Sequence, residues 1–138
     1  MFKYSEIREE NEKMAREYGK KIVDMLADGD YEGVFSIVDD FDNGWAKENL
    51  NELAETMEMD MEDNDVRISP YDTAEIPDIT YKDGSKYKRE YFYYNEEDKN
   101  DFSFSYECDL LPTDLTLMLD FIYSNGMYKV VFCDIHQM

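Results

Sequence analysis

Two runs of alternating residues flank Asn125-Gly126 near the C-terminus, and this arrangement constrains the fold more than any other feature. Asn-Gly favours a two-residue type I′ turn, which joins antiparallel strands and fixes their register. The predicted strands are Leu115 to Ser124 and Met127 to Gln137. The pairs predicted on the core-facing side are Tyr123 with Tyr128, Phe121 with Val130, Leu119 with Phe132, Leu117 with Asp134, and Leu115 with His136.

The rest of the chain after Val66 is also rich in aromatic and β-branched residues separated by turn signals. Val66 to Ile68 fits a short strand, and Asp83-Gly84 predicts a hairpin between residues 79–82 and 86–94. Residues 102–110 then alternate between large apolar and small polar side chains, which indicates one buried and one wet face. We expect a curved antiparallel β-sheet of about four to six strands.

The first 60 residues have the helical periodicity that the second half lacks. Ser5 is a candidate cap for a long amphipathic helix that ends at Asp28-Gly29. Asp30 can cap a short second helix over residues 31–40, and a third is predicted over 45–59. The sequence therefore predicts an α+β fold with three N-terminal helices packed on the sheet, in a single domain over 1–138 (helical half 1–60, sheet half 66–138).

Negative charge is concentrated between Asp28 and Asp65, which include fourteen acidic residues and one base, Lys47. This segment accounts for thirteen of the twenty excess negative charges of the chain. Such a field favours a basic protein partner and disfavours nucleic acid, whose phosphates require clustered Lys and Arg. The residues predicted to bind that partner are Trp45, Glu48, Glu52, Glu55, Glu58, Asp60 and Glu62.

The tyrosines offer a second candidate surface, because Tyr87, Tyr91 and Tyr93 share one face of their strand with Arg89. Tyrosine supplies a large contact area at a low entropy cost, which suits a binding face. Core packing of a bent sheet explains the same pattern equally well. The mixed outer face of the final hairpin is also compatible with a homodimer contact.

An alternative site follows from the predicted register, which places Asp134 and His136 at one end of the core-facing side. A carboxylate can orient an imidazole, so the pair suits acid/base chemistry of an isomerase or hydratase type, or small-molecule binding. Terminal polar residues that simply meet water are the other interpretation. The predicted pocket residues are Phe121, Tyr123, Tyr128, Phe132, Asp134 and His136.

The sequence carries no nucleophile, phosphate-loop, dinucleotide or metalloprotease motif. Residues 28–39 partly match a calcium-binding loop, but Val34 and Phe35 fit a helix there, so we expect no metal and no cofactor. Cys108 and Cys133 are expected to be buried free thiols. No segment has the length of a signal peptide or membrane span, and a cytoplasmic protein without membrane contact is expected.

The order of helices and sheet resembles the cone-shaped, cystatin-like nuclear transport factor two-like superfamily. Residues 27–34, Ala-Asp-Gly-Asp-Tyr-Glu-Gly-Val, are similar to the "GDYEGL" turn between helices of that superfamily. Residues 114–117, 128–130 and 134–136 resemble the end of a small bacterial domain of unknown function linked to toxin-immunity neighbourhoods. The resemblance implies an immunity-type inhibitor of a basic toxin and transfers no catalytic residue. We therefore expect a non-enzymatic acidic binding protein.

Overall fold

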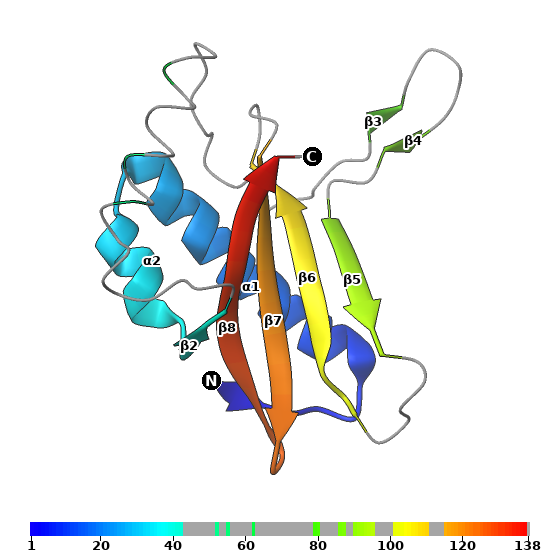
Figure 1. Ribbon diagram of the computed structural model, residues 1–138. Helices are drawn as coiled ribbons and strands as arrows, with labels where there is room; N and C mark the ends of the chain where they lie inside the picture. Colours follow the sequence, from blue (N-terminus) through cyan, green and yellow to red (C-terminus); the bar gives the residue numbers. More distant parts are fainter. Residues whose placement is uncertain are drawn as a thin grey trace.

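The computed structural model describes residues 1–42, 52, 55, 62, 79–80, 86–87, 90–95, 101–110 and 115–137. These residues form an α+β fold in which two helices accompany a six-stranded sheet (Figure 1). The elements are β1 (Phe2–Lys3), α1 (Arg8–Asp28), α2 (Tyr31–Ile37), β2 (Asp40–Phe41), β3 (Ile79–Thr80), β4 (Lys86–Tyr87), β5 (Glu90–Tyr94), β6 (Phe104–Asp109), β7 (Leu115–Ser124) and β8 (Met127–Gln137).

The main sheet has the strand order β1-β8-β7-β6-β5, and α1 crosses behind it in Figure 1. The core lies between this helix and the sheet. Helix α1 contributes Ala15, Ile22 and Leu26, all nearly inaccessible to solvent. The sheet contributes alternate residues, which are Phe104, Tyr106, Cys108, Leu117, Leu119, Phe121, Tyr128, Val130 and Phe132.

Helix α1 begins later than the sequence predicts, because Ser5 is not its cap. The helix starts at Arg8, and Ile7 occupies the capping position without a side-chain hydrogen bond. The Ser5 hydroxyl instead accepts a hydrogen bond from the Ile7 amide and donates one to Glu10. The predicted end of the helix is confirmed, since Gly29 has a φ of 75° there.

Helix α2 is shorter than predicted and ends at Ile37. Its predicted cap is confirmed, because the Asp30 carboxylate accepts a hydrogen bond from the Gly33 amide at 3.0 Å. The interpretation of this segment as a turn between helices is also confirmed, since the helix occupies the positions that a calcium loop would need. Tyr31, Val34 and Phe35 are buried, as their spacing predicts.

The register of the β7–β8 hairpin is confirmed near its turn and wrong beyond Leu119. The pairs Ser124–Met127, Tyr123–Tyr128, Phe121–Val130 and Leu119–Phe132 form as predicted. A β-bulge between Met118 and Leu119 then shifts the register, so Met118 pairs with Asp134, Leu117 with Ile135, Thr116 with His136, and Leu115 with Gln137. The extra residue on β8 exchanges the faces of every residue that follows it.

Strands β5 and β6 have the alternation that the sequence predicts. Phe104, Tyr106 and Cys108 are buried, whereas Tyr91 and Tyr93 on the other side are exposed. Of the strand predicted over residues 86–94, the described residues form β4 and β5, and β4 pairs with β3 in a two-stranded sheet. The antiparallel β3–β4 pair confirms the predicted pairing of residues 79–82 with the start of 86–94, and the turn predicted at Asp83-Gly84 lies outside the described residues.

Two short strands at the β8 edge have no counterpart in the sequence-based prediction. Strand β1 pairs with β8 at Tyr128 and Met127, and β2 pairs in parallel with Val131 and Phe132. Two helices have defined bounds within the described residues, so the third helix predicted over 45–59 is not confirmed. Glu52 and Glu55 are helical, but the rest of that segment lies outside the described residues, as does the strand predicted at Val66 to Ile68.

Candidate functional site

The side of the sheet that faces away from α1, here called the outer face, carries the strongest candidate site. Cross-strand pairing arranges it in rows, one from Tyr91 through Glu107 and Met118, the next from Tyr93 through Ser105 and Asp120. Side chains alternate along a strand, so these residues share one face while their neighbours enter the core. The outer face comprises Tyr91, Tyr93, Ser105, Glu107, Met118, Asp120, Ile122, Lys129 and Asp134.

Aromatic and aliphatic side chains on the outer face are accessible to solvent. Tyr91 is 40% exposed, Tyr93 is 50% exposed and Ile122 is 41% exposed. The two tyrosine rings stack with centroids 6.1 Å apart and an interplanar angle of 27°. Stacking restricts both side chains before any partner arrives, which reduces the entropy lost when they are buried in a complex.

Carboxylates lie among these apolar groups and are held by neighbouring hydroxyls. The Tyr93 hydroxyl donates to the Glu107 carboxylate at 3.4 Å, and Ser105 donates to Asp120 at 2.6 Å. Burial raises the pKa of Tyr93, and the Glu107 charge raises it further, so the phenol keeps its proton as a donor. Each carboxylate thus has a defined position on the sheet.

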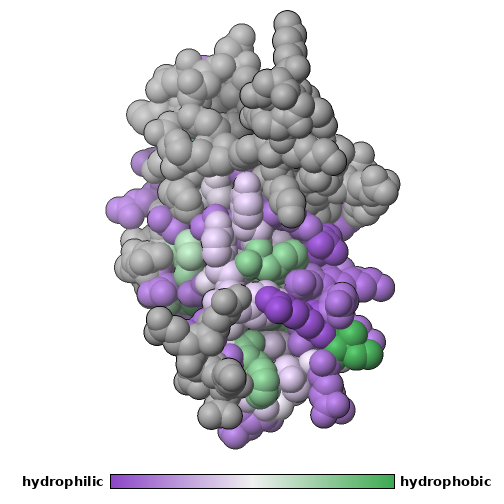
Figure 2. All heavy atoms as spheres, turned by 90° about the vertical axis from the view of Figure 1, so that its right-hand side faces the viewer, coloured by the Kyte–Doolittle hydropathy of each residue, from purple (hydrophilic) through white to green (hydrophobic). Residues whose placement is uncertain are grey.

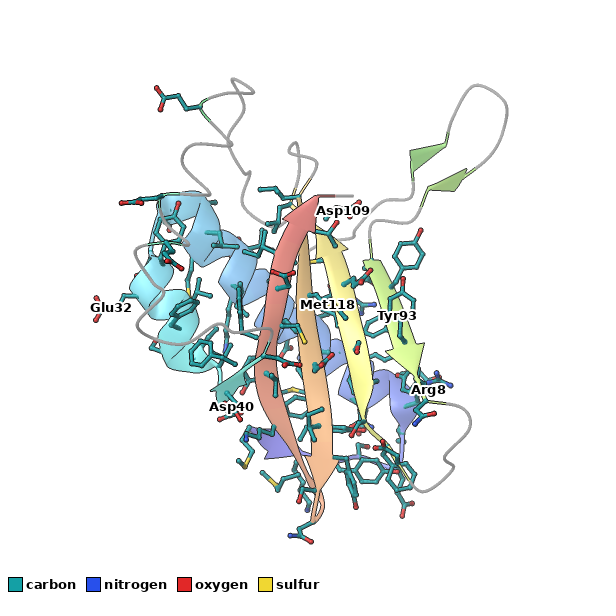
Figure 3. The ribbon with its side chains drawn as sticks, in the orientation of Figure 1. Arg8, Glu32, Asp40, Tyr93, Asp109 and Met118 are labelled. Atoms are coloured by element: carbon teal, nitrogen blue, oxygen red, sulfur yellow. The ribbon has the colours of Figure 1, made fainter. Side chains whose placement is uncertain are left out.

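Positive charge on the outer face comes from one residue of β5 to β8, Lys129. Its ammonium group forms a 2.8 Å ion pair with Asp40 of β2, which lowers the pKa of that carboxyl group. Figure 3 shows Met118, Tyr93 and Asp109 on the main strands, with Asp40 beside β8 at the opposite edge. The described outer face therefore combines apolar contact groups with a net negative charge.

The edge of the sheet at β5 is largely polar. Figure 2 views the molecule from this side and shows hydrophilic residues over most of the described surface, interrupted by separate hydrophobic patches. The exposed hydrophobic groups are therefore dispersed among polar ones on this side of the molecule.

Among the described helices, none has the length and apolar character required to cross a membrane.

Asp42, Asp120 and Cys133 place one ligand-type atom each within 4.8 Å of one another. Cys133 is 2% exposed, and its burial together with the nearby carboxylates raises the pKa of its thiol. A thiol binds metal as the thiolate, which this environment disfavours. We therefore interpret the cluster as a structural feature of β8, in which Cys133, beside the bulge, is hydrogen-bonded to Asp120.

The structure packs the predicted aromatic pocket residues together in the core, with the Tyr123 and Tyr128 ring centroids 6.0 Å apart, but separates Asp134 from them. Phe121 and Phe132 are fully buried and Tyr128 is 2% exposed, all within the core. The bulge places Asp134 opposite Met118 on the outer face, where its carboxylate accepts a hydrogen bond from the Ile135 amide. The predicted core-facing pair of Asp134 and His136 is therefore wrong, since Ile135 occupies the core-facing position of β8 instead.

Most of the predicted partner-binding residues lie outside the described residues. These are Trp45, Glu48, Glu58 and Asp60. Glu52, Glu55 and Glu62 are described and exposed. The exposure of Tyr91 and Tyr93 favours the binding-face interpretation of these tyrosines over the core-packing one.

Sequence reasoning did not identify Glu107, Met118 and Ile122 as members of a common surface. Alternation alone predicted a wet face for β6. The pairing of β6 with β5 and β7 brings that face beside the exposed tyrosines, and this neighbour relationship is not encoded in any local motif.

Comparison with known proteins gives no family for this chain. No protein family, no curated protein and no solved structure matches it.

Proposed function

We propose that the protein is a non-enzymatic acidic binding protein whose outer face docks a basic protein. The observation that carries this proposal is the combination of exposed Tyr91, Tyr93 and Ile122 with the carboxylates of Glu107 and Asp120. Exposed aromatic residues anchor many protein interfaces, and surrounding charges select the partner and speed its approach.

Charge complementarity identifies the chemistry of the partner. The chain has a formal net charge of −20, and the Lys129 ammonium group on the outer face is already paired with Asp40. An acidic partner would be repelled, whereas a protein with clustered Lys and Arg would be attracted at long range. A basic toxin, for example a nuclease with a phosphate-binding surface, fits this description, and the protein would then act as an immunity-type inhibitor.

The acidic segment between Asp28 and Asp65 adds to this field. Glu52, Glu55 and Glu62 are exposed, so their charges face solvent. We propose that Trp45 and the acidic residues 48–62 extend the same interaction. Replacement of Glu48, Glu52 and Glu55 by Lys should weaken binding without unfolding the chain, and unchanged affinity would remove this segment from the proposal.

The experiment is a capture from source-cell lysate with three immobilised forms of the protein, followed by mass spectrometry. The forms are the wild type, Glu107→Lys on the outer face, and Glu17→Lys on an exposed position of α1. The two variants change net charge equally, so a difference between them reports position and not total charge. A basic protein retained by the wild type and Glu17→Lys, lost by Glu107→Lys, and released by salt supports the proposal.

Two outcomes of this capture experiment would contradict the proposal. Equal retention by all three forms would show that the outer face makes no specific contact. Equal loss with both variants would show that capture depends on the overall charge and not on its position, and the outer face would then be removed from the proposal.

A further inference from the structure

Strand β5 forms one edge of the main sheet. It comes last in the strand order, beside β6, and Figure 1 shows it at the right-hand side of the sheet. Among the described residues, no strand pairs with β5 on its other side. An edge strand presents a row of backbone N–H and C=O groups that can pair with an incoming strand.

The register of the sheet identifies which backbone groups of β5 face outward. The Leu110 amide donates to the Leu115 carbonyl, in the register that continues along the β6–β7 pair. Backbone groups alternate along a strand, so residues 104, 106 and 108 turn theirs towards β7, and residues 105 and 107 turn theirs towards β5. Tyr93 and Tyr91 are paired with residues 105 and 107. The outward N–H and C=O groups therefore belong to the alternate residues Glu90, Phe92 and Tyr94.

The outer-face side of this edge favours basic side chains on an incoming strand. Such a strand would place every second side chain beside the exposed rings of Tyr91 and Tyr93, whose faces attract cations. Glu107 is paired with Tyr91 on the next strand and accepts a hydrogen bond from the Tyr93 hydroxyl at 3.4 Å. Two strand spacings, about 10 Å, separate its backbone from that of the incoming strand. A Lys or Arg side chain and the glutamate side chain can span this distance together.

The core-facing side of the same edge favours different side chains. The Arg8 guanidinium group lies 3.5 Å from the centroid of the Tyr94 ring, and that of Arg16 lies 5.6 Å from the centroid of Phe92. Glu90 is on this side too, and its carboxylate is paired with Arg16. A cation placed here would meet guanidinium groups, whereas an apolar side chain would extend the contact with the rings. The two sides of β5 therefore favour basic and apolar residues in alternation.

The charge of the chain distinguishes between two possible occupants of the edge. A second copy of the protein would bring a further formal charge of −20 to it, and the repulsion opposes pairing of β5 with itself. A basic segment gains from the same field. Charge complementarity thus favours a strand from a basic protein.

We propose that the β5 edge accepts an extended segment of the basic partner as a seventh strand of the six-stranded sheet. Lys or Arg occupies every second position of that segment, on the outer-face side, and apolar residues lie between them. This inference rests on the proposed function, because it describes how the partner docks beside the outer face. A partner can also bind the outer face without adding a strand, so the two proposals can fail separately.

The test is amide hydrogen exchange of the full chain, followed by NMR, with two capped heptapeptides of equal composition. The alternating probe is Thr-Lys-Val-Lys-Val-Lys-Thr, and the block probe is Thr-Val-Val-Lys-Lys-Lys-Thr. The alternating probe at saturation should slow exchange of the Phe92 and Tyr94 amides at least about tenfold, while Tyr91 and Tyr93, already bonded to β6, change little. It should bind about tenfold more tightly than the block probe, as a few added cross-strand pairs predict.

Two variants of equal charge locate the contact. Glu107→Lys should weaken the alternating probe about two- to fivefold, the effect of one exposed ion pair, and Glu17→Lys on an exposed position of α1 should leave it unchanged.

Three results would overturn the added strand. The first is slow exchange of Phe92 and Tyr94 in the free protein, which would show that the edge is already paired. The second is equal affinity for the two probes. The third is binding of the alternating probe without protection of these two amides. In each case the capture experiment decides separately whether a basic protein docks on the outer face.

Discussion

Glu90 is the one acidic residue of β5, and it lies on the core-facing side of that strand. Its side chain is 18% exposed and accepts hydrogen bonds from the Arg16 guanidinium group, including one of 2.5 Å from Nη2. The Tyr106 hydroxyl, on a residue with no exposed surface, donates to the same carboxylate at 2.9 Å. One carboxylate thus connects α1 to two neighbouring strands.

Replacement of Glu90 by Ala should destabilise the protein by about 1–3 kcal/mol, because it removes the charged acceptor of two partly or fully buried donors. Urea unfolding monitored by circular dichroism measures this change. Glu107→Ala is the matched control, since Glu107 lies on the outer face and its truncation should cost at most about 0.5 kcal/mol. Equal stability of both variants would show that the Glu90 network contributes nothing.

Alternation in the sequence places Glu90 on the same side of its strand as Phe92 and Tyr94, and the structure agrees. It does not identify Arg16 as the partner, because that residue is 74 positions away in the chain. Periodicity reports the side on which a residue lies. The contacts across the core depend on the packing of whole elements, which no local pattern contains.

Helix α1 packs closely against β6 at Gly19. A Cβ atom at that position would lie 2.6 Å from Cε1 of Tyr106, well inside contact distance. Tyr106 is fully buried and bound to Glu90, so its ring has no room to retreat. Glycine is therefore required here for close packing, although it is a poor helix former.

Gly19→Ala should destabilise the protein by about 1–3 kcal/mol, the usual effect of overpacking a dense core. The expected sign is opposite to the gain of about 1 kcal/mol that Ala brings in an exposed helix. Lys13→Ala, at an exposed position of the same helix, is the control and should change little. A Gly19→Ala variant more stable than the wild type would contradict this account of the helix–sheet contact.

The β7–β8 hairpin shows how far an element can be predicted from sequence. Asn125 and Gly126 have φ values of 51° and 79°, as a type I′ turn requires, and the register follows from the turn as far as Leu119. The bulge then inserts one residue on β8, and the predicted site at Asp134 and His136 disappears with the shift. Strict alternation on both strands gives no signal for an inserted residue.

At the scale of the whole molecule, the sheet and core follow from hydrophobic patterning, whereas the outer face does not. The outer face depends on which strands are neighbours. Strand β1 has two residues, too few for any periodicity, yet it pairs with β8 and brings Phe2 into the core. Such placement is decided by tertiary packing.

The folded state should lose stability at alkaline pH. Burial raises the pKa of the Cys108 thiol to about 12, and also raises those of Tyr94 and Tyr128. These groups hold their protons more tightly when folded, so their contribution is complete below the unfolded values. For Cys108 it falls by up to about 1.4 kcal/mol per pH unit from about pH 8.5 upward.

Urea unfolding at a series of pH values from neutral to about pH 11 tests this prediction. The Cys108→Ala variant serves as the control, because it lacks the thiol and should show a shallower decline above about pH 8.5. An identical pH dependence in both proteins would show that Cys108 does not titrate between the folded and unfolded states as its burial requires.

The central claim is that the outer face binds a basic protein, and the most direct measurement is calorimetric titration of the captured partner into purified variants. Tyr91→Ala combined with Tyr93→Ala removes the aromatic contact, and Glu107→Lys reverses one charge. Each should weaken the affinity at least about tenfold, as expected for residues at the centre of an interface. Glu17→Lys on α1 should bind like the wild type, and equal affinity of all four proteins would contradict the claim.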